Sequence, residues 1–252
     1  MDKRSPNRLK KLTITITTFC ILAGGSVLAS DDDPFEPVNR VVFGVNDTVD
    51  KVVLKPTAKV YRAIMPDFAE RGVRNFFSNL GEVRNAVHNT LQGKFGGTAL
   101  STGRFVINST VGIGGLFDVA SKIGIEQKRE DLGQTLGVWG LNSGPYLVLP
   151  IVGPSSLRDG FGVLADPFLN PMTYAPLDLP ERLGVGVLSG VQTRADLLSA
   201  EGLLNGDTYT LYRQAYLSKR QFDVNDGIIV NDEFLDDDPF ESMDDEFLDE
   251  AF

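Results

Sequence analysis

The fold is decided by residues 132–157, LGQTLGVWGLNSGPYLVLPIVGPSSL, a segment without a charged side chain. A membrane-spanning helix needs about 20 predominantly apolar residues, and this segment is long enough. Its glycines and Pro145, Pro150 and Pro154 nevertheless break it into short pieces, so a simple spanning helix is not expected. Broken backbone is tolerated at membrane depth only against protein or a water-filled cavity. Taken alone, the segment favours a buried hairpin in an ordinary soluble core.

Upstream of this segment, the spacing predicts helices. Valines recur along one stripe of residues 37–54, as in an amphipathic helix that could lie in a membrane interface; they are Val38, Val41, Val42, Val45, Val49, Val52 and Val53. Lys55-Pro56 predicts the end of this helix, and a short helical segment follows to about Met65. Asp67 and Glu70 have the form of a capping box, which predicts the start of a helix that runs through Leu80. Another short helix is expected from Val83 to Leu91.

The remaining chain also favours helices over strands. The glycine-rich loop 111–115 lacks the residues of a phosphate-binding loop and is interpreted as a hinge or a point of close packing. We therefore expect an all-α fold with glycine-rich loops, in which the further helices occupy residues 97–111, 116–123, 155–165, 180–204 and 208–222.

The negative charge belongs to one end of the chain. The 252 residues carry 24 Lys and Arg against 34 Asp and Glu. Residues 1–29 hold five bases and one acid, and residues 223–252 hold thirteen acids and no base, which leaves 19 bases and 20 acids for residues 30–222. A nearly neutral body lacks the basic surface of a nucleic-acid-binding protein, so no nucleic-acid partner is expected.

The two ends are interpreted as appendages of a helical domain at residues 30–226. Residues 1–29 have the basic start, apolar run and small-residue ending of a signal peptide cleaved after Ala29, with an uncleaved membrane anchor as the alternative. Cys20, the only cysteine, lies inside this signal, so we expect no disulfide and no lipid anchor in the mature chain. Residues 227–252 are interpreted as an acidic, disordered tail.

No constellation of catalytic residues is visible. His88 is the only histidine, and its polar neighbours predict a solvated position on a helix surface. Ser143 does not have the spacing of a nucleophile elbow, and Glu130, Asp131 and Asp159 have no feature that separates catalysis from capping. We therefore predict a protein that is not an enzyme, with no catalytic residue, no cofactor site and no metal site.

Several blocks resemble the VacJ/MlaA family of outer-membrane phospholipid-transport proteins. They run in order along nearly the whole mature body: DPFEPVNR (33–40), NFFSNL (75–80), NTLQGKF (89–95), GRFVINSTVGIGGLFDVA (103–120), EDLGQTLGVWGLNSGPYLVLPIVGPSSLRDGFG (130–162), TRADLL (193–198) and YTLYRQAYLSKR (209–220). Most members of the family are lipoproteins, and the absence of an acylated cysteine here departs from that pattern.

The resemblance implies a single, mostly helical, ring-like domain with amphipathic interfacial helices, embedded from the periplasmic side in the inner leaflet of the cell outer membrane. It implies removal of misplaced phospholipids from the outer leaflet and their transfer to a periplasmic carrier protein, which maintains lipid asymmetry. It also implies a trimeric porin partner. The alternative is a soluble periplasmic lipid carrier or scaffold.

The charge-free segment supplies the candidates for a lipid channel. Trp139, Tyr146, Leu147 and Leu149 are hypothesised to contribute to its lipid-facing wall, with packing in the core as the alternative for each. Gly137, Gly140 and Gly144 are hypothesised to allow close approach of the backbone.

Overall fold

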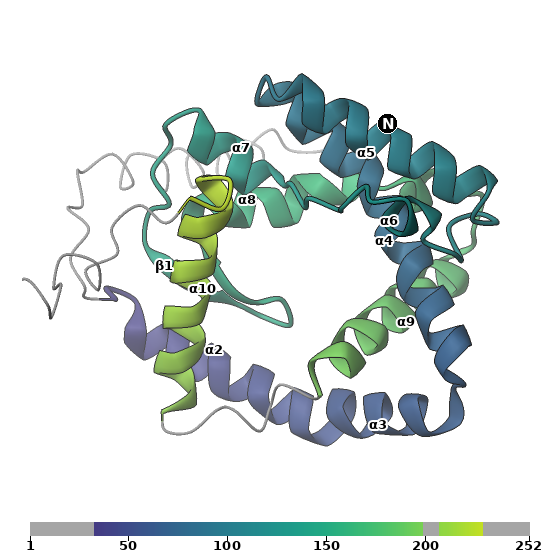
Figure 1. The fold of residues 1–252 in the computed structure, drawn as a ribbon. Coiled ribbons are helices and arrows are strands. Elements are labelled where there is room, and N and C mark those ends of the chain that lie inside the picture. The colour runs from purple at the N-terminus through teal and green to yellow at the C-terminus, as the bar shows by residue number, and fades with distance from the viewer. Residues whose placement is uncertain (1–32, 199–206, 229–252) are drawn as a thin grey trace, which may run out of the picture. The chain divides into compact units, whose positions relative to one another are not determined.

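The computed structural model describes residues 33–198 and 207–228, and this part of the chain is helical apart from one two-stranded hairpin (Figure 1). The predicted all-α fold class is confirmed. All the described elements belong to one unit that begins at Phe35. The expected signal peptide, residues 1–29, and most of the expected acidic tail, residues 227–252, lie outside the described residues.

The first helical stretch is longer than predicted. Helix α2 (Glu36–Val49), the π turn η1 (Asp50–Leu54) and α3 (Lys55–Ile64) follow one another without a break, and we call them together the rod. The predicted helix end at Lys55-Pro56 is wrong. Proline lacks an N–H and clashes with the carbonyl four residues earlier in an α-helix. The wider π turn directly before Pro56 accommodates the proline, with the Lys55 N–H bonded to the Asp50 carbonyl.

Two asparagines fasten the rod to the hairpin. The Asn39 amide donates to the Tyr146 carbonyl at 3.0 Å and accepts from the Val148 N–H at 2.9 Å. Two helical turns later, Asn46 donates to the Leu149 carbonyl at 2.9 Å and accepts from the Ile151 N–H at 2.8 Å. Seven helical residues rise about 10.5 Å, close to the length of three strand steps. The spacing of the asparagines therefore matches the hairpin that they hold.

Helix α4 (Asp67–Leu91) is a single helix, so the predicted division into two helices near Gly81 is wrong. One interior glycine costs only about 1 kcal/mol relative to alanine, and α4 packs along α5 (Phe95–Thr110). The predicted capping box at Asp67 is also wrong, because Pro66 is the N-cap and no side chain caps α4.

Glycines bring the turn after α5 close to α4. A Cβ on Gly112 would lie 2.2 Å from the Phe117 carbonyl oxygen, and one on Gly115, where φ is +92°, would lie 2.7 Å from Asn79. Close packing is therefore one role of this glycine-rich loop. The short helix α6 (Val119–Lys122) follows.

The charge-free segment forms helix α7 (Leu132–Val138) and an antiparallel hairpin. Its strands β1 (Tyr146–Leu149) and β2 (Gly153–Ser156) pair Tyr146 with Ser156 and Leu149 with Gly153. The hairpin interpretation of this segment is confirmed. Across residues 33–198 and 207–228, no helix combines the length and the apolar character that crossing a bilayer requires.

The remaining elements complete a closed circuit of contacts. They are α8 (Leu157–Ala165), the 3-10 turns η2 (Asp166–Leu169) and η3 (Pro171–Tyr174), α9 (Leu179–Leu197) and α10 (Thr208–Val224). The rod packs on β1, β2 on α10, α10 on α7, α7 on α4, α4 on α9, and α9 back on the rod (Figure 1). This circuit agrees with the predicted ring-like arrangement.

Candidate functional site

Apolar and polar side chains are distributed in the reverse of the usual way. The largest fully buried side chains in the described part of the chain are all polar: Arg104, His88, Glu82, Asn85, Thr135 and Ser156. In water-soluble proteins, large buried side chains are mostly apolar, and broad exposed apolar surfaces mark interaction sites. This distribution is suited to an exterior that contacts an apolar medium.

The rod carries the longest exposed apolar surface, which we call the valine face. Val41 is 68% exposed and Ile64 is 76% exposed; the full set is Val38, Val41, Val45, Val49, Val52, Val53, Val60 and Ile64. Val42, predicted on the same stripe, packs instead against the buried cluster around Tyr146. The asparagines that bond α2 to the hairpin lie beside this stripe, and the exposed valines of the amphipathic helix face outward.

A buried ion pair joins α4 to α5. The side chains of Arg104 and Glu82 are 2% and 0% exposed, and the Arg104 Nε donates to Glu82 at 2.6 Å. Arg104 also donates to Asp118 at 3.2 Å and to the Ile125 carbonyl. Burial by itself lowers the pKa of Arg104, but Glu82 and Asp118 outweigh it and raise the pKa above its ordinary value. The interior on this side is therefore ionic.

A cavity of about 440 Å³ opens between α4, α7, β2, α8 and α10. This volume is within the usual range for ligand pockets. Apolar and charged groups both line it: Leu80, Gly81, Arg84, Asp131, Pro154, Ser155, Asp159, Gly162, Val163, Asp166, Pro167, Asn170, Tyr216 and Arg220. The cavity thus offers an apolar wall beside a strongly polar one.

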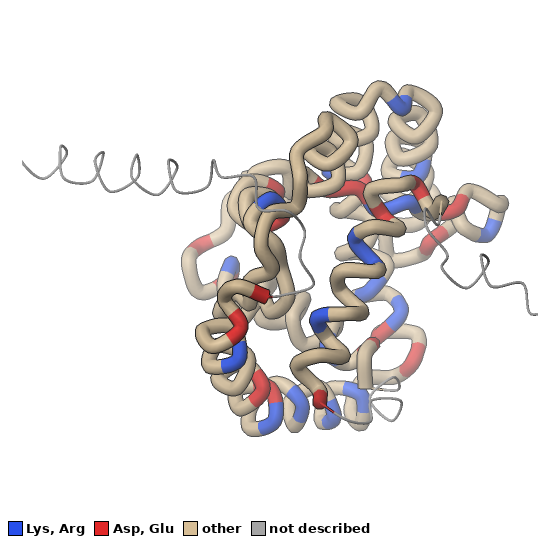
Figure 2. Tube along the Cα trace, turned by 90° about the vertical axis from the view of Figure 1, so that its left-hand side faces the viewer, with Lys and Arg blue, Asp and Glu red and all other residues tan. Residues whose placement is uncertain are grey.

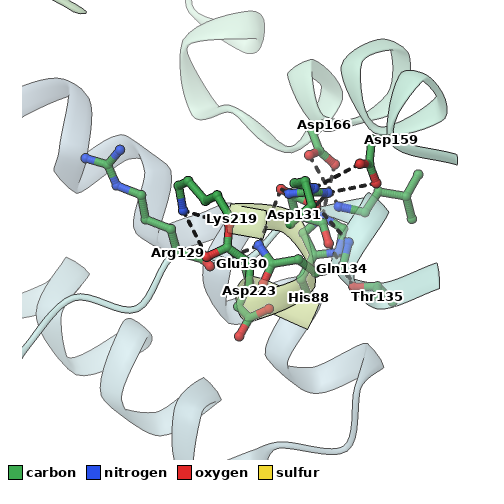
Figure 3. A network of polar contacts seen from close by, with 12 residues as sticks. His88, Arg129, Glu130, Asp131, Gln134, Thr135, Asp159, Asp166, Lys219 and Asp223 are labelled. Atoms are coloured by element: carbon green, nitrogen blue, oxygen red, sulfur yellow. Dashed lines mark hydrogen bonds and ion pairs between the residues drawn. The ribbon is translucent and has the colours of Figure 1, made fainter. Parts of the chain in front are cut away.

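Arg220 of α10 organises the polar wall. It donates both Nη groups to Asp131, the N-cap of α7, at 2.7 and 3.0 Å, and its Nε to Asp159 in the first turn of α8 at 2.9 Å. Tyr216 also donates to Asp159. Figure 3 shows the two carboxylates near each other. The sequence left both catalysis and capping open for Asp131, and the structure shows capping of α7.

This network shifts the pKa values of its members. Burial would raise the pKa of Asp159, but Arg220, Tyr216 and Arg158 outweigh burial and hold it well below its usual range. The pKa of Asp131 is likewise lowered, because the hydrogen bonds and charge of Arg220 exceed the effect of burial. Burial and Asp159 raise the pKa of the Tyr216 hydroxyl.

We expect the network to make stability depend on acid pH. The folded-state pKa values of Asp131 and Asp159 lie below the unfolded values of about 3.9, so their contribution is present above about pH 4 and is lost as pH falls toward the folded-state values. Replacing Arg220 with methionine should lower Tm at pH 7, and the difference from the wild type should shrink toward pH 2. Thermal unfolding followed by circular dichroism measures this difference.

The control for this experiment is Lys219→Met, which removes an exposed pair with Asp223 on the same helix. Its Tm should stay near the wild-type value at every pH, because exposed pairs contribute about 0–1 kcal/mol. A difference between wild type and Arg220→Met that stays constant from pH 7 to pH 2 would contradict the assignment.

The predicted surface position of His88 is wrong. The residue is 1% exposed, its Nδ1 lies 2.9 Å from the Thr135 hydroxyl, and its Nε2 lies 3.0 Å from Asp166 (Figure 3). The histidine therefore connects α4 to α7 and η2. Its sequence neighbours did not reveal this, because the partners lie 47 and 78 positions away.

The aromatic and leucine candidates do not form one cluster. Trp139 is 59% exposed and donates to the Leu91 carbonyl, whereas Tyr146 is 4% exposed and packs edge-on against Tyr209. Leu147 and Leu149 are partly buried and alternate with the buried Tyr146 and Val148 of β1. None of the four lines the cavity. Their contribution to a lipid-facing wall stays a prediction.

The glycine candidates have different surroundings. A Cβ on Gly137 would lie 2.8 Å from the Arg158 guanidinium, and one on Gly144 would lie 3.1 Å from Leu157. Gly140 has open space around it and a φ of +90°. Gly133, which the sequence reasoning did not single out, has closer neighbours than these three glycines, because a Cβ there would lie 2.2 Å from Asp159 and 2.4 Å from Arg220.

Charged residues of both signs are interspersed along the described trace (Figure 2). Within residues 33–198 and 207–228, no three His, Cys, Asp or Glu side chains are grouped so that they could hold a metal ion. The chemistry of the cavity therefore rests on arginines, carboxylates and a tyrosine.

Comparison with known families identifies the chain. The sequence model of the MlaA lipoprotein family matches residues 31–223. The chain belongs to this family. The intermembrane phospholipid transport system lipoprotein MlaA of Escherichia coli is 35% identical over 201 residues, which cover 77% of this chain and 79% of that protein. The Haemophilus influenzae protein of the same name is 31% identical, over 84% of this chain and 88% of its own length.

Two further similarities accompany these MlaA proteins. An uncharacterized protein of Rickettsia typhi is 43% identical, but the match spans only 56% of this chain and 57% of that protein. A solved structure, reported as the structural basis for maintenance of bacterial outer membrane lipid asymmetry, is similar with a TM-score of 0.67 and 35% identity. The match covers 77% of this chain and 99% of the chain in that structure.

Sequence reasoning missed most of the polar site. Arg84, Asp166, Tyr216 and Arg220 were not singled out, because each meets its neighbours only in the folded chain. A signal was present in Gly133 and Gly137, four residues apart on one side of α7, since small residues at this spacing permit close packing. The Asp159 and Arg220 side chains lie against Gly133, and Arg158 lies against Gly137.

Proposed function

We propose that this protein is the outer-membrane component of an intermembrane phospholipid transport system. It removes misplaced phospholipids from the outer leaflet and passes them to a periplasmic carrier protein, which maintains lipid asymmetry. The observation that carries the proposal is the outward valine face combined with a polar interior. Family membership and the names of the Escherichia coli and Haemophilus influenzae relatives support it.

The physical task suits this arrangement. A charged group at the bilayer centre costs about 2.5–3.5 kcal/mol on insertion scales, and each methylene taken from lipid into water costs about 0.8 kcal/mol. A passage with polar and apolar walls lowers both barriers without making or breaking a covalent bond. We therefore propose transport rather than catalysis.

We propose that the rod lies at the periplasmic face of the outer membrane. Its 29 residues, 36–64, extend about 43 Å, and an amphipathic helix of this kind lies in the interface with its apolar face about 5–10 Å deep. The partners proposed from the family are a trimeric porin and the carrier. Residues 1–29 would serve as the export signal, and residues 227–252 as an acidic tail of the domain at 30–226.

We expect Leu147→Asp to lower phospholipid transfer from reconstituted vesicles to an acceptor by about tenfold or more. Leu147 is partly buried and lies on the other face of β1 from the buried Tyr146 and Val148, so a charge there meets the proposed lipid wall without entering the cluster around Tyr146. Transfer of a fluorescent phospholipid measures the effect. Tyr146→Asp is unsuitable, because Tyr146 is buried among Val148 and Tyr209 and its replacement would disturb folding.

Asn142→Asp is the matched control, because it adds the same charge at an exposed position of the preceding loop. It should transfer lipid at the wild-type rate. Equal rates of lipid transfer for Leu147→Asp and wild type would show that Leu147 does not contribute to the lipid-facing wall. Wild-type protein that a salt wash releases entirely from outer-membrane fractions would instead favour a soluble periplasmic carrier, and wild-type protein that transfers no lipid would contradict the proposed function.

A further inference from the structure

Arg84 is the exception in the polar wall of the cavity. Its Nε is buried and has no hydrogen-bond partner. A buried donor without a partner costs about 1–3 kcal/mol, and more when it belongs to a charged group. The side chain is thus left with binding capacity that the folded chain does not use.

The carboxylates that line the cavity are already engaged. Asp131 and Asp159 accept from Arg220. Asp166 faces the His88 Nε2 at 3.0 Å and accepts from the Leu132 N–H at 3.4 Å. An anion that reached Arg84 would therefore displace no existing pair.

The surroundings of Arg84 are open and partly apolar. Gly81, one turn earlier on α4, lines the cavity, and a Cβ on it would meet no atom within 4 Å. Leu80, Val163 and Pro167 add apolar surface. A guanidinium presents a planar set of donors that matches two phosphate oxygens, which makes arginine the preferred partner of phosphate groups.

We infer that Arg84 binds the phosphate group of an anionic ligand, and that the phosphodiester of a glycerophospholipid headgroup is its ligand in the transport proposed above. The apolar lining accommodates the glycerol and the first methylenes beside the phosphate. The identification of a lipid rests on the proposed function, whereas the affinity of Arg84 for a phosphate group rests on the cavity alone.

The test is binding of dihexanoyl phosphatidylglycerol to the full chain in amphipol, measured by calorimetry. Arg84→Gln should weaken binding at least tenfold. Gly81→Leu should do the same by filling the open space, and leucine favours the helix, so the fold is retained. Arg71→Gln is the matched control, because Arg71 is exposed on the same helix and does not line the cavity; binding should stay within twofold of wild type.

A second measurement needs no substitution. Phenylglyoxal modifies accessible arginines, and mass spectrometry locates the adducts. Phosphatidylglycerol should protect Arg84 in the wild-type chain and leave Arg71 reactive, whereas uncharged dihexanoylglycerol should protect neither. The site would be overturned if neither phosphatidylglycerol nor inorganic phosphate reduced the modification of Arg84. It would also be overturned if Arg84→Gln bound phosphatidylglycerol with the wild-type affinity.

The outcomes of these experiments distinguish a lipid phosphate from free phosphate, and they distinguish failure of the anion site from failure of the proposed function. Protection by inorganic phosphate as strong as that by the lipid would keep the anion site but assign it to free phosphate. If wild-type protein transfers no phospholipid while phosphate still protects Arg84, the proposed function fails and the anion site stands. If Arg84→Gln transfers and binds lipid like wild type, the anion site fails and the proposed function stands.

Discussion

Replacing Val41 and Val52 together with aspartate is expected to release the protein from outer-membrane vesicles. Both valines are more than two-thirds exposed on the valine face, so the substitutions leave the packing of the rod intact. Withdrawing a valine side chain from apolar surroundings costs about 1.5–3 kcal/mol. Two such losses correspond to a decrease of about a hundredfold or more in the partition coefficient between membrane and water. Sedimentation with vesicles that contain phosphatidylethanolamine and phosphatidylglycerol measures the bound fraction.

The control keeps the same two positions apolar. Val41→Leu with Val52→Leu should sediment like wild type, and circular dichroism should show unchanged helix content in both variants. If the aspartate variant is folded and still sediments like wild type, the valine face does not contact lipid.

The second large effect concerns the buried pair between α4 and α5. Glu82→Leu is expected to lower the free energy of unfolding by about 3–5 kcal/mol, because it leaves the Arg104 charge in the interior without its main partner. Urea unfolding followed by the fluorescence of Trp139, the only tryptophan, measures the loss.

Two variants make this result interpretable. Glu82→Leu combined with Arg104→Met removes both charges and should recover part of the loss, since apolar replacement of a buried pair is often tolerated. Asp47→Ala breaks only the exposed pair with Lys51 and should change the free energy of unfolding by about 1 kcal/mol or less. A loss for Glu82→Leu as small as that for Asp47→Ala would contradict the role of the pair.

Helical periodicity predicted much of the fold. The valine stripe, the helices near 155–165 and 208–222 and the hairpin interpretation of the charge-free segment agree with the structure. Proline and glycine were less successful as predictors of where helices end. Pro56 indicates the end of an α-helix, but a π turn accommodates it, and Gly81 does not interrupt α4, which packs along its neighbour.

The polar site was largely beyond prediction, because its contacts join distant parts of the chain. Polar residues on a helix normally face water, so His88 was assigned to the surface. Here the apolar side of the rod faces outward and the polar sides of α4 and α7 face inward. Sequence periodicity gives the two sides of a helix, but it does not state which of them is covered by the rest of the molecule.

The asparagine contacts of the rod have a consequence for biogenesis. Asn39 bonds to backbone groups 107 and 109 positions later, and Arg220 joins α10 to Asp131 across 89 positions. During synthesis, the rod emerges long before the hairpin that satisfies its asparagines. Such non-local contacts slow folding and leave apolar surface exposed meanwhile. The rod and its valine face are therefore made first, and the rod stays unsupported until the hairpin at residues 146–156 has been made.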